Sequence, residues 1–169
     1  MIKTFQKKAG QPMEFDPVAT ACFTGHRSIP PQREESIRRK TEQTVLDLIF
    51  RGYDTFIVGG ALGFDTLAQQ VLTTLRQEFP YIRIVMAIPC PEQDKNWSET
   101  DRHTYRQLLE SADARILIAR EYSRECMLKR NRYMVHHSSA CIAYCTKDTG
   151  GTAYTVRYAK DTGKTVLFI

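Results

Sequence analysis

The sequence predicts an α/β protein with an open, doubly wound and mainly parallel sheet of about six strands, with helices on both faces. Three observations predict this architecture. Short apolar runs alternate with segments of helical periodicity along the chain. A helical segment lies between consecutive apolar runs, which indicates parallel strands covered on both faces. Finally, 169 residues with 42% hydrophobic and 25% charged side chains are typical of one globular domain.

Six apolar runs are predicted to form strands, at residues 19–23, 55–58, 82–88, 114–119, 140–144 and 164–168. The segments between them predict five helices. Four of them are expected at residues 30–52, 98–112, 124–137 and 152–160, and the second has Asp65 in its first turn and an apolar stripe at residues 67–79. Right-handed crossovers between parallel strands make this a Rossmann-like sheet. Residues 1–16 are expected to form an N-terminal arm, and residues 17–169 a single domain.

Composition narrows the function classes. No apolar stretch approaches the roughly 20 residues of a membrane span, and residues 1–16 lack the apolar region of a secretory signal. A cytoplasmic protein without a membrane partner is therefore expected. The net charge of +5 permits anionic ligands but does not by itself indicate nucleic acid. Five cysteines without a C-x-x-C pair fit a reducing compartment, and without zinc-ligand spacing no metal site is expected.

Glycine-containing turns follow three of the predicted strands, at residues 24–27, 59–65 and 149–152. Each precedes a helix, where free backbone N–H groups and the helix dipole attract anions. The alternative explanation is that these glycines only allow the backbone to form tight turns. Because the carboxyl ends of parallel strands share one edge, we expect the three turns to bind one phosphate-bearing ligand. The residues predicted to bind phosphate through backbone N–H groups are Gly59, Gly60, Gly63, Gly150, Gly151 and Thr152, and Thr24, Gly25 and Ala61 are predicted to contact the same ligand.

Two standard nucleotide motifs are absent. The glycines at 59, 60 and 63 are spaced G-G-x-x-G rather than G-x-G-x-x-G. The Gly163-Lys164-Thr165 tripeptide precedes a strand, and Tyr158 stands where a P-loop has its first glycine. The sequence therefore indicates neither a standard NAD oxidoreductase nor a P-loop ATPase, and it names no certain cofactor.

Polar side chains near these turns are candidates for ligand contacts. His26 and Arg27 follow a glycine at a strand end, and the arginine is suited to bidentate phosphate binding. Asp65 is expected either to accept a ribose hydroxyl or base amine, or to complement the dipole of its helix. Arg130 is predicted to neutralise ligand charge. Asn131 lies inside a predicted helix, where asparagine is disfavoured, so we predict that it contacts ribose or base.

Two aromatic residues lie at the same predicted edge. Trp97, the single tryptophan, is in a proline-stiffened loop, where it either stacks on a base or packs onto the next helix. Tyr122 is predicted to stack on a base. It lies in the most basic part of the chain, residues 120–132. A solvated face is the alternative explanation for that charge.

Five motifs of the chain occur together in a known family. They are C-F-T-G-H-R at 22–27, G-G-A-L-G-F-D-T-L-A at 59–68, Gln93 with Trp97, R-N-R-Y-M-V at 130–135 and G-G-T at 150–152. Together they are similar to the motifs of the SLOG superfamily, specifically its small stand-alone YpsA-like branch. The resemblance implies a Rossmann-like domain whose glycine turns bind nucleotides or nucleotide-derived ligands, and it allows a homo-oligomer, since relatives often dimerise. One departure is His136, where the family usually has an aspartate.

Two other branches of the superfamily imply alternative functions. LOG-type phosphoribohydrolases carry a catalytic glutamate, but the matching position here is Thr155. A hydrolase acting on a nucleotide N-glycosidic or phosphate bond would have Asp65 and His26 as its acid–base pair. DprA-like proteins bind single-stranded DNA and share an element similar to residues 60–68, followed here by Gln69 in place of a histidine. Single-stranded nucleic acid is thus an alternative partner to a small nucleotide-like ligand.

Overall fold

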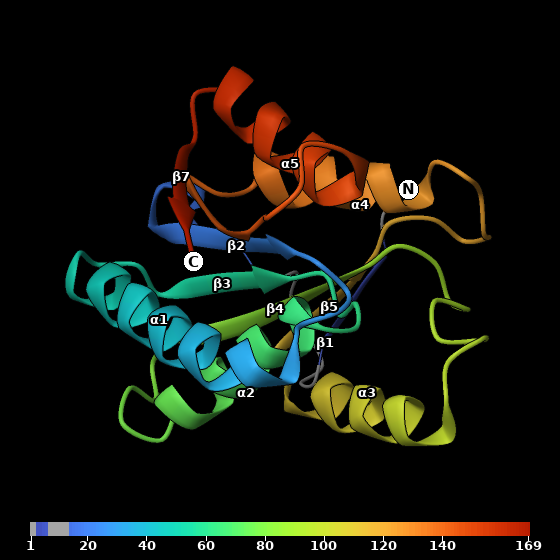
Figure 1. Ribbon diagram of the computed structural model, residues 1–169, viewed down its shortest axis with the longest axis horizontal. Coiled ribbons are helices and arrows are strands. Elements are labelled where there is room, and N and C mark those ends of the chain that lie inside the picture. Colours follow the sequence, from blue (N-terminus) through green and yellow to red (C-terminus); the bar gives the residue numbers. More distant parts are fainter. Residues whose placement is uncertain (1–2, 7–13) are drawn as a thin grey trace.

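A computed structural model describes residues 3–6 and 14–169 and contains one seven-stranded sheet between two layers of helices (Figure 1). The strand order is β1-β5-β4-β3-β2-β6-β7, and every neighbouring pair is parallel except β1 with β5. The predicted doubly wound, mainly parallel architecture is confirmed. The strands are β1 (Lys3–Gln6), β2 (Thr20–Gly25), β3 (Thr55–Val58), β4 (Arg83–Ile88), β5 (Ala114–Leu117), β6 (Ala140–Tyr144) and β7 (Thr165–Phe168).

The strand that the sequence did not predict is β1. It runs antiparallel to β5, with Lys3 opposite Leu117 and Gln6 opposite Ala114. Its sequence, K-T-F-Q, has no apolar run that would have predicted a strand. An edge strand can form without one, because it pairs through backbone groups with the free edge of its neighbour. The segment expected to be an arm therefore contributes to the sheet, while the division into arm and domain stays a prediction.

Helices α1, α2 and α3 cover one face of the sheet, and α4 and α5 cover the other (Figure 1). The second helix begins after Gly63, whose φ of +75° is accessible to glycine, so Asp65 lies in its first turn as predicted. The last helix begins at Gly150, earlier than predicted. The helices are α1 (Pro31–Phe50), α2 (Phe64–Leu75), α3 (Glu99–Ser111), α4 (Cys126–His136) and α5 (Gly150–Asp161), with a 3-10 turn at Pro17–Ala19.

The core lies on both faces of the central strands. Phe23 of β2 packs against Phe56 of β3 and Phe64 of α2, with ring centroids 6.4 and 6.2 Å apart. On the other face, Ile57 of β3 belongs to the cluster that contains Met134 of α4. Burial of this apolar area drives folding and fixes the ends of β2, β3 and β6 relative to the helices that follow them.

The chain order creates a crevice in the sheet. From β2 the chain adds β3, β4 and β5 on one side, and it then crosses to the other side to add β6 and β7. The strands on either side of this reversal, β2 and β6, are neighbours. Loops leaving the carboxyl ends of two such strands diverge to opposite faces, which leaves room for a ligand between them.

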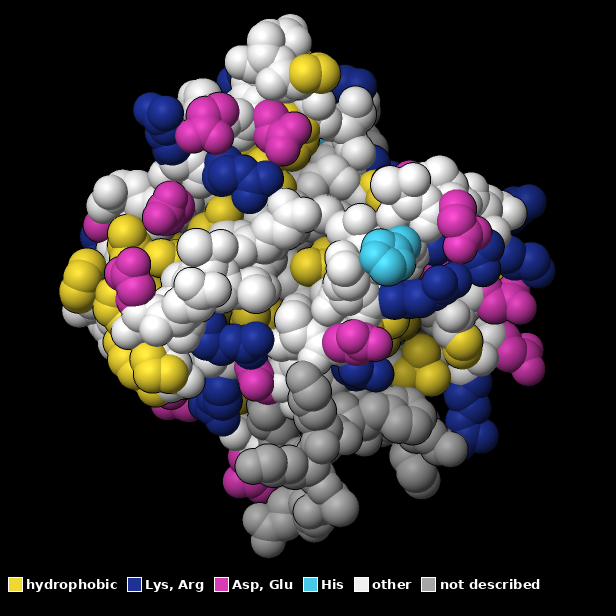
Figure 2. All heavy atoms as spheres, turned by 90° about the horizontal axis from the view of Figure 1, so that it is seen from below, with side chains coloured by type: hydrophobic (Ala, Val, Ile, Leu, Met, Phe, Trp, Pro, Cys, Tyr) yellow, Lys and Arg dark blue, Asp and Glu magenta, His cyan; other side chains and the backbone are white. Residues whose placement is uncertain are grey.

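The face formed by α1, α2 and α3 differs between its two ends. Figure 2 shows apolar side chains gathered toward its left end, whereas a group of Lys and Arg side chains lies toward the right. The left end is the one at which α1 ends, and the right end is the one at which β2 and β3 end (Figures 1 and 2). In the described part of the chain, no helix has the length and apolar character needed to cross a membrane.

Candidate functional site

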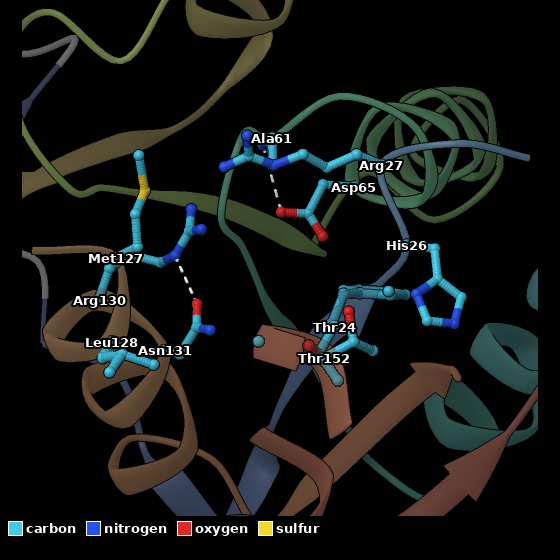
Figure 3. A pocket seen from close by; sticks show the side chains of 13 residues that line it. Thr24, His26, Arg27, Ala61, Asp65, Met127, Leu128, Arg130, Asn131 and Thr152 are labelled. Atoms are coloured by element: carbon cyan, nitrogen blue, oxygen red, sulfur yellow. Dashed lines mark hydrogen bonds between the residues drawn. The ribbon is translucent and has the colours of Figure 1, made fainter. Parts of the chain in front are cut away.

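A cavity of about 350 Å³ opens at the carboxyl ends of β2 and β6. The turns after β2 and β3 and the amino-terminal parts of α4 and α5 meet around it (Figure 3). Most of the predicted site residues therefore share one cavity, although they come from four separate segments. The lining residues are Phe23, Thr24, Gly25, His26, Arg27, Ala61, Asp65, Met127, Leu128, Arg130, Asn131, Gly151 and Thr152.

The remaining predicted residues lie elsewhere. Trp97 and Tyr122 line a second cavity of about 620 Å³, which shares Arg27 and Met127 with the first. Gly63 lines a third cavity at the start of α2. The residues Gly59, Gly60 and Gly150 do not line any of the three cavities. Sequence reasoning missed Met127 and Leu128, because apolar side chains in a helix resemble ordinary core positions.

The amino terminus of α5 is open toward the first cavity. The N-cap residue Thr149 makes no side-chain capping bond, and the first turn carries no acidic residue. A Cβ added at Gly150 or Gly151 would meet no atom within 4 Å. The first N–H groups of a helix have no partner inside the helix. This end therefore offers donors and positive dipole charge to an anion.

The turn after β3 is instead filled from inside the protein. The carbonyl oxygen of Gly59 accepts a hydrogen bond from Arg130 Nη1, and that of Gly60 accepts one from Gln93 Nε2 at 3.0 Å. The N–H of Ala61 donates to Asp65 Oδ2 at 3.2 Å (Figure 3). These polar groups are already satisfied by protein partners.

Asp65 and Arg130 carry opposite charges in a buried position, with 6% and 5% of their surface exposed. Burial raises the pKa of Asp65, while the charge of Arg130 and the N–H groups of Ala61 and Gly59 oppose the rise. Burial also lowers the pKa of Arg130, and Asp65 opposes that change. Each charge thus limits the desolvation penalty of the other.

A chain of hydrogen bonds ties α4 to α5 beneath the cavity. Arg130 Nε donates to Asn131 Oδ1, Asn131 Nδ2 donates to Thr155 Oγ1, and the Thr155 hydroxyl donates to the Gly151 carbonyl, each at 2.8 Å. Both polar ends of Asn131 are therefore engaged, which explains a polar residue inside this helix. Thr155, at the position of the LOG-type glutamate, is 1% exposed.

His26 links the turn after β2 to the turn after β6. Its Nε2 accepts a hydrogen bond from the Thr146 N–H at 2.8 Å. Burial and the nearby Lys147 lower the pKa of His26, so the ring is held neutral. Within the described residues, no hydrogen bond joins His26 to Asp65.

Arg27 differs from these residues because its side chain is exposed. In the part of the chain that the structure describes, its guanidinium makes no hydrogen bond and no ion pair. It lines all three cavities, including the first and the second. A cation in this position is available to a ligand.

His136, which stands where a family aspartate is usual, lies away from the cavities. Its Nε2 is 2.6 Å from the hydroxyl oxygen of Tyr158 on α5, and the residue is exposed. His136 is not among the residues that line the first cavity.

Comparison with solved structures shows the same fold. The chain superposes on DNA processing protein A from Helicobacter pylori, described for its single-stranded DNA binding mode, with a TM-score of 0.64 and 16% identity. It superposes on DNA processing protein A (DprA) from Streptococcus pneumoniae with a TM-score of 0.66 and 15% identity. These matches cover 90% and 89% of this chain, but 65% and 50% of those chains.

Sequence comparison identifies nearer relatives. The chain is 36% identical to the uncharacterized SPbeta prophage-derived protein YoqJ of Bacillus subtilis, over 63% of this chain and 70% of that protein. It is 32% identical to a UPF0398 protein of Halalkalibacterium halodurans, over 73% of this chain and 67% of that protein. The model of the YspA SLOG family matches residues 23–166, which include the turns and both helix starts around the cavity. The chain belongs to the YspA SLOG family.

Proposed function

We propose that this protein binds a nucleotide or a nucleotide-derived ligand in the first cavity. The observation that carries the proposal is the open amino terminus of α5 in the same cavity, of about 350 Å³, as Arg27, whose guanidinium makes no hydrogen bond or ion pair with the described residues. This volume falls within the roughly 300–1,000 Å³ typical of small-molecule sites. Family membership supports the proposal, because glycine turns of SLOG proteins are expected to bind such ligands.

The lining gives each part of a nucleotide a matching group. The N–H groups of Gly151 and Thr152 and the guanidinium of Arg27 suit a phosphate. The carboxyl group of Asp65 suits a ribose hydroxyl or a base amino group, both of which are donors. Repulsion between Asp65 and a phosphate favours an orientation in which the phosphate lies at α5 and the sugar at α2.

A thermal-shift screen with AMP, ADP, NAD, ADP-ribose and cyclic dinucleotides tests this proposal. A site filled at about 100 times its Kd adds about 2.7 kcal/mol to the free energy of unfolding. For a domain of this size, we expect the Tm to rise by about 5–10 °C. Inorganic phosphate alone is the comparison for simple anion binding.

The matched variants separate the site from general charge effects. Arg27→Ala is expected to reduce the shift by most of its size. Arg39→Ala removes the same charge from an exposed position on α1, where Arg39 pairs with Glu35 at 2.9 Å, and is expected to leave the shift unchanged. If no nucleotide raises the Tm of the unaltered protein, the proposal is wrong.

A second candidate is binding of single-stranded nucleic acid. Tyr122 is 67% exposed and lies between the exposed residues Arg120 and Arg124, a combination that suits base stacking along a charged strand. The DprA-like fold supports this candidate. It predicts that the affinity for a labelled oligothymidine falls steeply with salt, and that Arg124→Ala reduces the slope, as measured by fluorescence anisotropy.

A further inference from the structure

The second cavity adjoins the first and has a different character. Its volume of about 620 Å³ is also within the range of small-molecule sites. Arg27 and Met127 line both cavities, so the two share a wall. Each cavity is large enough for a ligand unit of its own, and the guanidinium of Arg27 lies where two such units would be joined.

Two aromatic side chains, those of Trp97 and Tyr122, line the second cavity. Trp97 packs edge-on against Tyr105, with ring centroids 5.3 Å apart, which holds the indole in place. Tyr122 is 67% exposed. Lys95 and Glu92 form an ion pair at 3.3 Å and largely neutralise each other. This lining suits a planar ring, because bases stack on aromatic side chains.

Gln93 is a buried polar residue in the lining of this cavity. It is 8% exposed, and its Nε2 donates to the Gly60 carbonyl at 3.0 Å and to the Tyr105 hydroxyl at 3.3 Å. A carbonyl accepts only, so these bonds assign the nitrogen, and the other end of the amide is the oxygen. Within the described residues, Oε1 has no hydrogen-bond partner. These two bonds fix the Gln93 side chain between the turn after β3 and Tyr105 of α3.

From this juxtaposition we propose that the ligand has two ring-bearing units joined through phosphate. The first unit lies in the cavity at α5, the linking phosphate contacts Arg27, and the second ring lies against Trp97 and Tyr122. The inference rests on the proposed function and narrows its ligand class from nucleotides in general to dinucleotide-type molecules.

Calorimetric titration with ADP and with diadenosine diphosphate tests the inference on the full chain. The second adenine is expected to increase affinity by about tenfold or more, the contribution of one stacked base. Trp97→Ala and Tyr122→Ala are expected to remove this advantage and to leave the affinity for ADP within about twofold. Trp97→Phe keeps a stacking ring and is expected to retain most of the advantage. Tyr81→Ala, which removes a 58% exposed aromatic side chain after α2, is the control.

The fluorescence of the single tryptophan gives an independent readout. Diadenosine diphosphate is expected to quench Trp97, whereas ADP is not. If the two ligands bind equally well, or if ADP quenches Trp97 and Trp97→Ala weakens both ligands equally, the two-unit ligand is wrong and the proposed function stands. If neither ligand binds, the two-unit ligand is wrong, and if in addition no nucleotide of the thermal-shift screen raises the Tm, the proposed function fails as well. If oligothymidine binds and diadenosine diphosphate does not compete with it, the site belongs to single-stranded nucleic acid.

Discussion

The turns after β3 and β6 look alike in the sequence and differ in the structure. Both contain two adjacent glycines and lead into a helix, although Gly150 and Gly151 are already the first residues of α5. A Cβ added at Gly59 would lie 2.3 Å from Arg130 Nη1 and 2.6 Å from Asp65 Oδ2, whereas one added at Gly151 would meet nothing within 4 Å. The first turn needs glycine because side chains of the protein pack against its backbone. The second has glycine beside open space, which is what a ligand requires.

A glycine turn at the edge of a sheet is therefore not by itself an anion-binding site. A turn at the carboxyl edge of a parallel sheet provides backbone N–H groups, but protein side chains compete with ligands for them. Asp65 accepts a hydrogen bond from Ala61 in the turn after β3. No acidic residue stands in the first turn of α5, and its N-cap makes no side-chain bond. Anion binding is therefore expected at the turn after β6.

The largest effect is expected from removing the side chain that fills the turn after β3. Arg130→Met leaves the Gly59 carbonyl without its donor and Asp65 without its nearby positive charge. Loss of one partner of a buried charged pair costs about 3 kcal/mol or more. A decrease of this size in the free energy of unfolding is expected, measured by urea denaturation.

Arg132→Met is the control for that variant. Arg132 lies on the exposed side of the same helix, where its Nε donates to the Tyr154 hydroxyl at 2.7 Å. Its loss is expected to cost less than about 1 kcal/mol. Equal destabilisation by the two variants would show that the turn after β3 is not held by Arg130.

The two glycine turns are compared directly by adding one methyl group to each. Gly59→Ala is expected to destabilise the fold by about 1–3 kcal/mol, because the buried charges around it must move. Gly151→Ala is expected to leave stability within about 0.5 kcal/mol, because the space is open and alanine favours a helix. Thermal unfolding of both variants measures this contrast.

The affinity for nucleotide is expected to fall more in Gly151→Ala than in Gly59→Ala, the reverse of the order expected for stability. The methyl group of Gly151→Ala projects at a position that lines the first cavity, so nucleotide affinity should fall while stability is retained. A Gly151→Ala protein that unfolds as easily as Gly59→Ala would contradict the distinction between a filled turn and an open one.

The smallest effect is expected from pH, at the contact between the turns after β2 and β6. The pKa of His26 is lowered mainly by burial, so the folded protein binds fewer protons than the unfolded chain. The free energy of unfolding should then fall as the pH drops from about 6.5, the ordinary pKa of histidine, through the lowered pKa of His26. Above a pH of about 6.5, the titration of this residue should not affect stability. Protonation of Nε2 also removes the acceptor for Thr146.

Urea denaturation as a function of pH measures this dependence. His26→Gln keeps an acceptor without a titrating group and is expected to flatten the curve between pH of about 5 and 7. His103→Gln, on α3, is expected to retain it. If the His26→Gln curve follows that of the unaltered protein, the contact with Thr146 does not depend on the charge of this ring.

Much of the fold was predictable because its signals are local. The strands at 55–58 and 140–144 were predicted to the residue, since each is a continuous run of mainly apolar residues. The start of α5 was predicted two residues late, because glycine is a poor helix former and Gly150 and Gly151 were assigned to the preceding turn. The strand β1 was missed because its pairing depends on the free edge of β5.

The sequence by itself determined which turns lie at one edge, since apolar periodicity defines the elements and right-handed crossovers align parallel strands. The grouping of Thr24, Asp65 and Gly151 around one cavity follows from that order. The tertiary structure alone decided which turn is filled and which is open. Arg130 reaches Gly59 across 71 residues of sequence, and a contact between such distant residues exists only after the chain has folded.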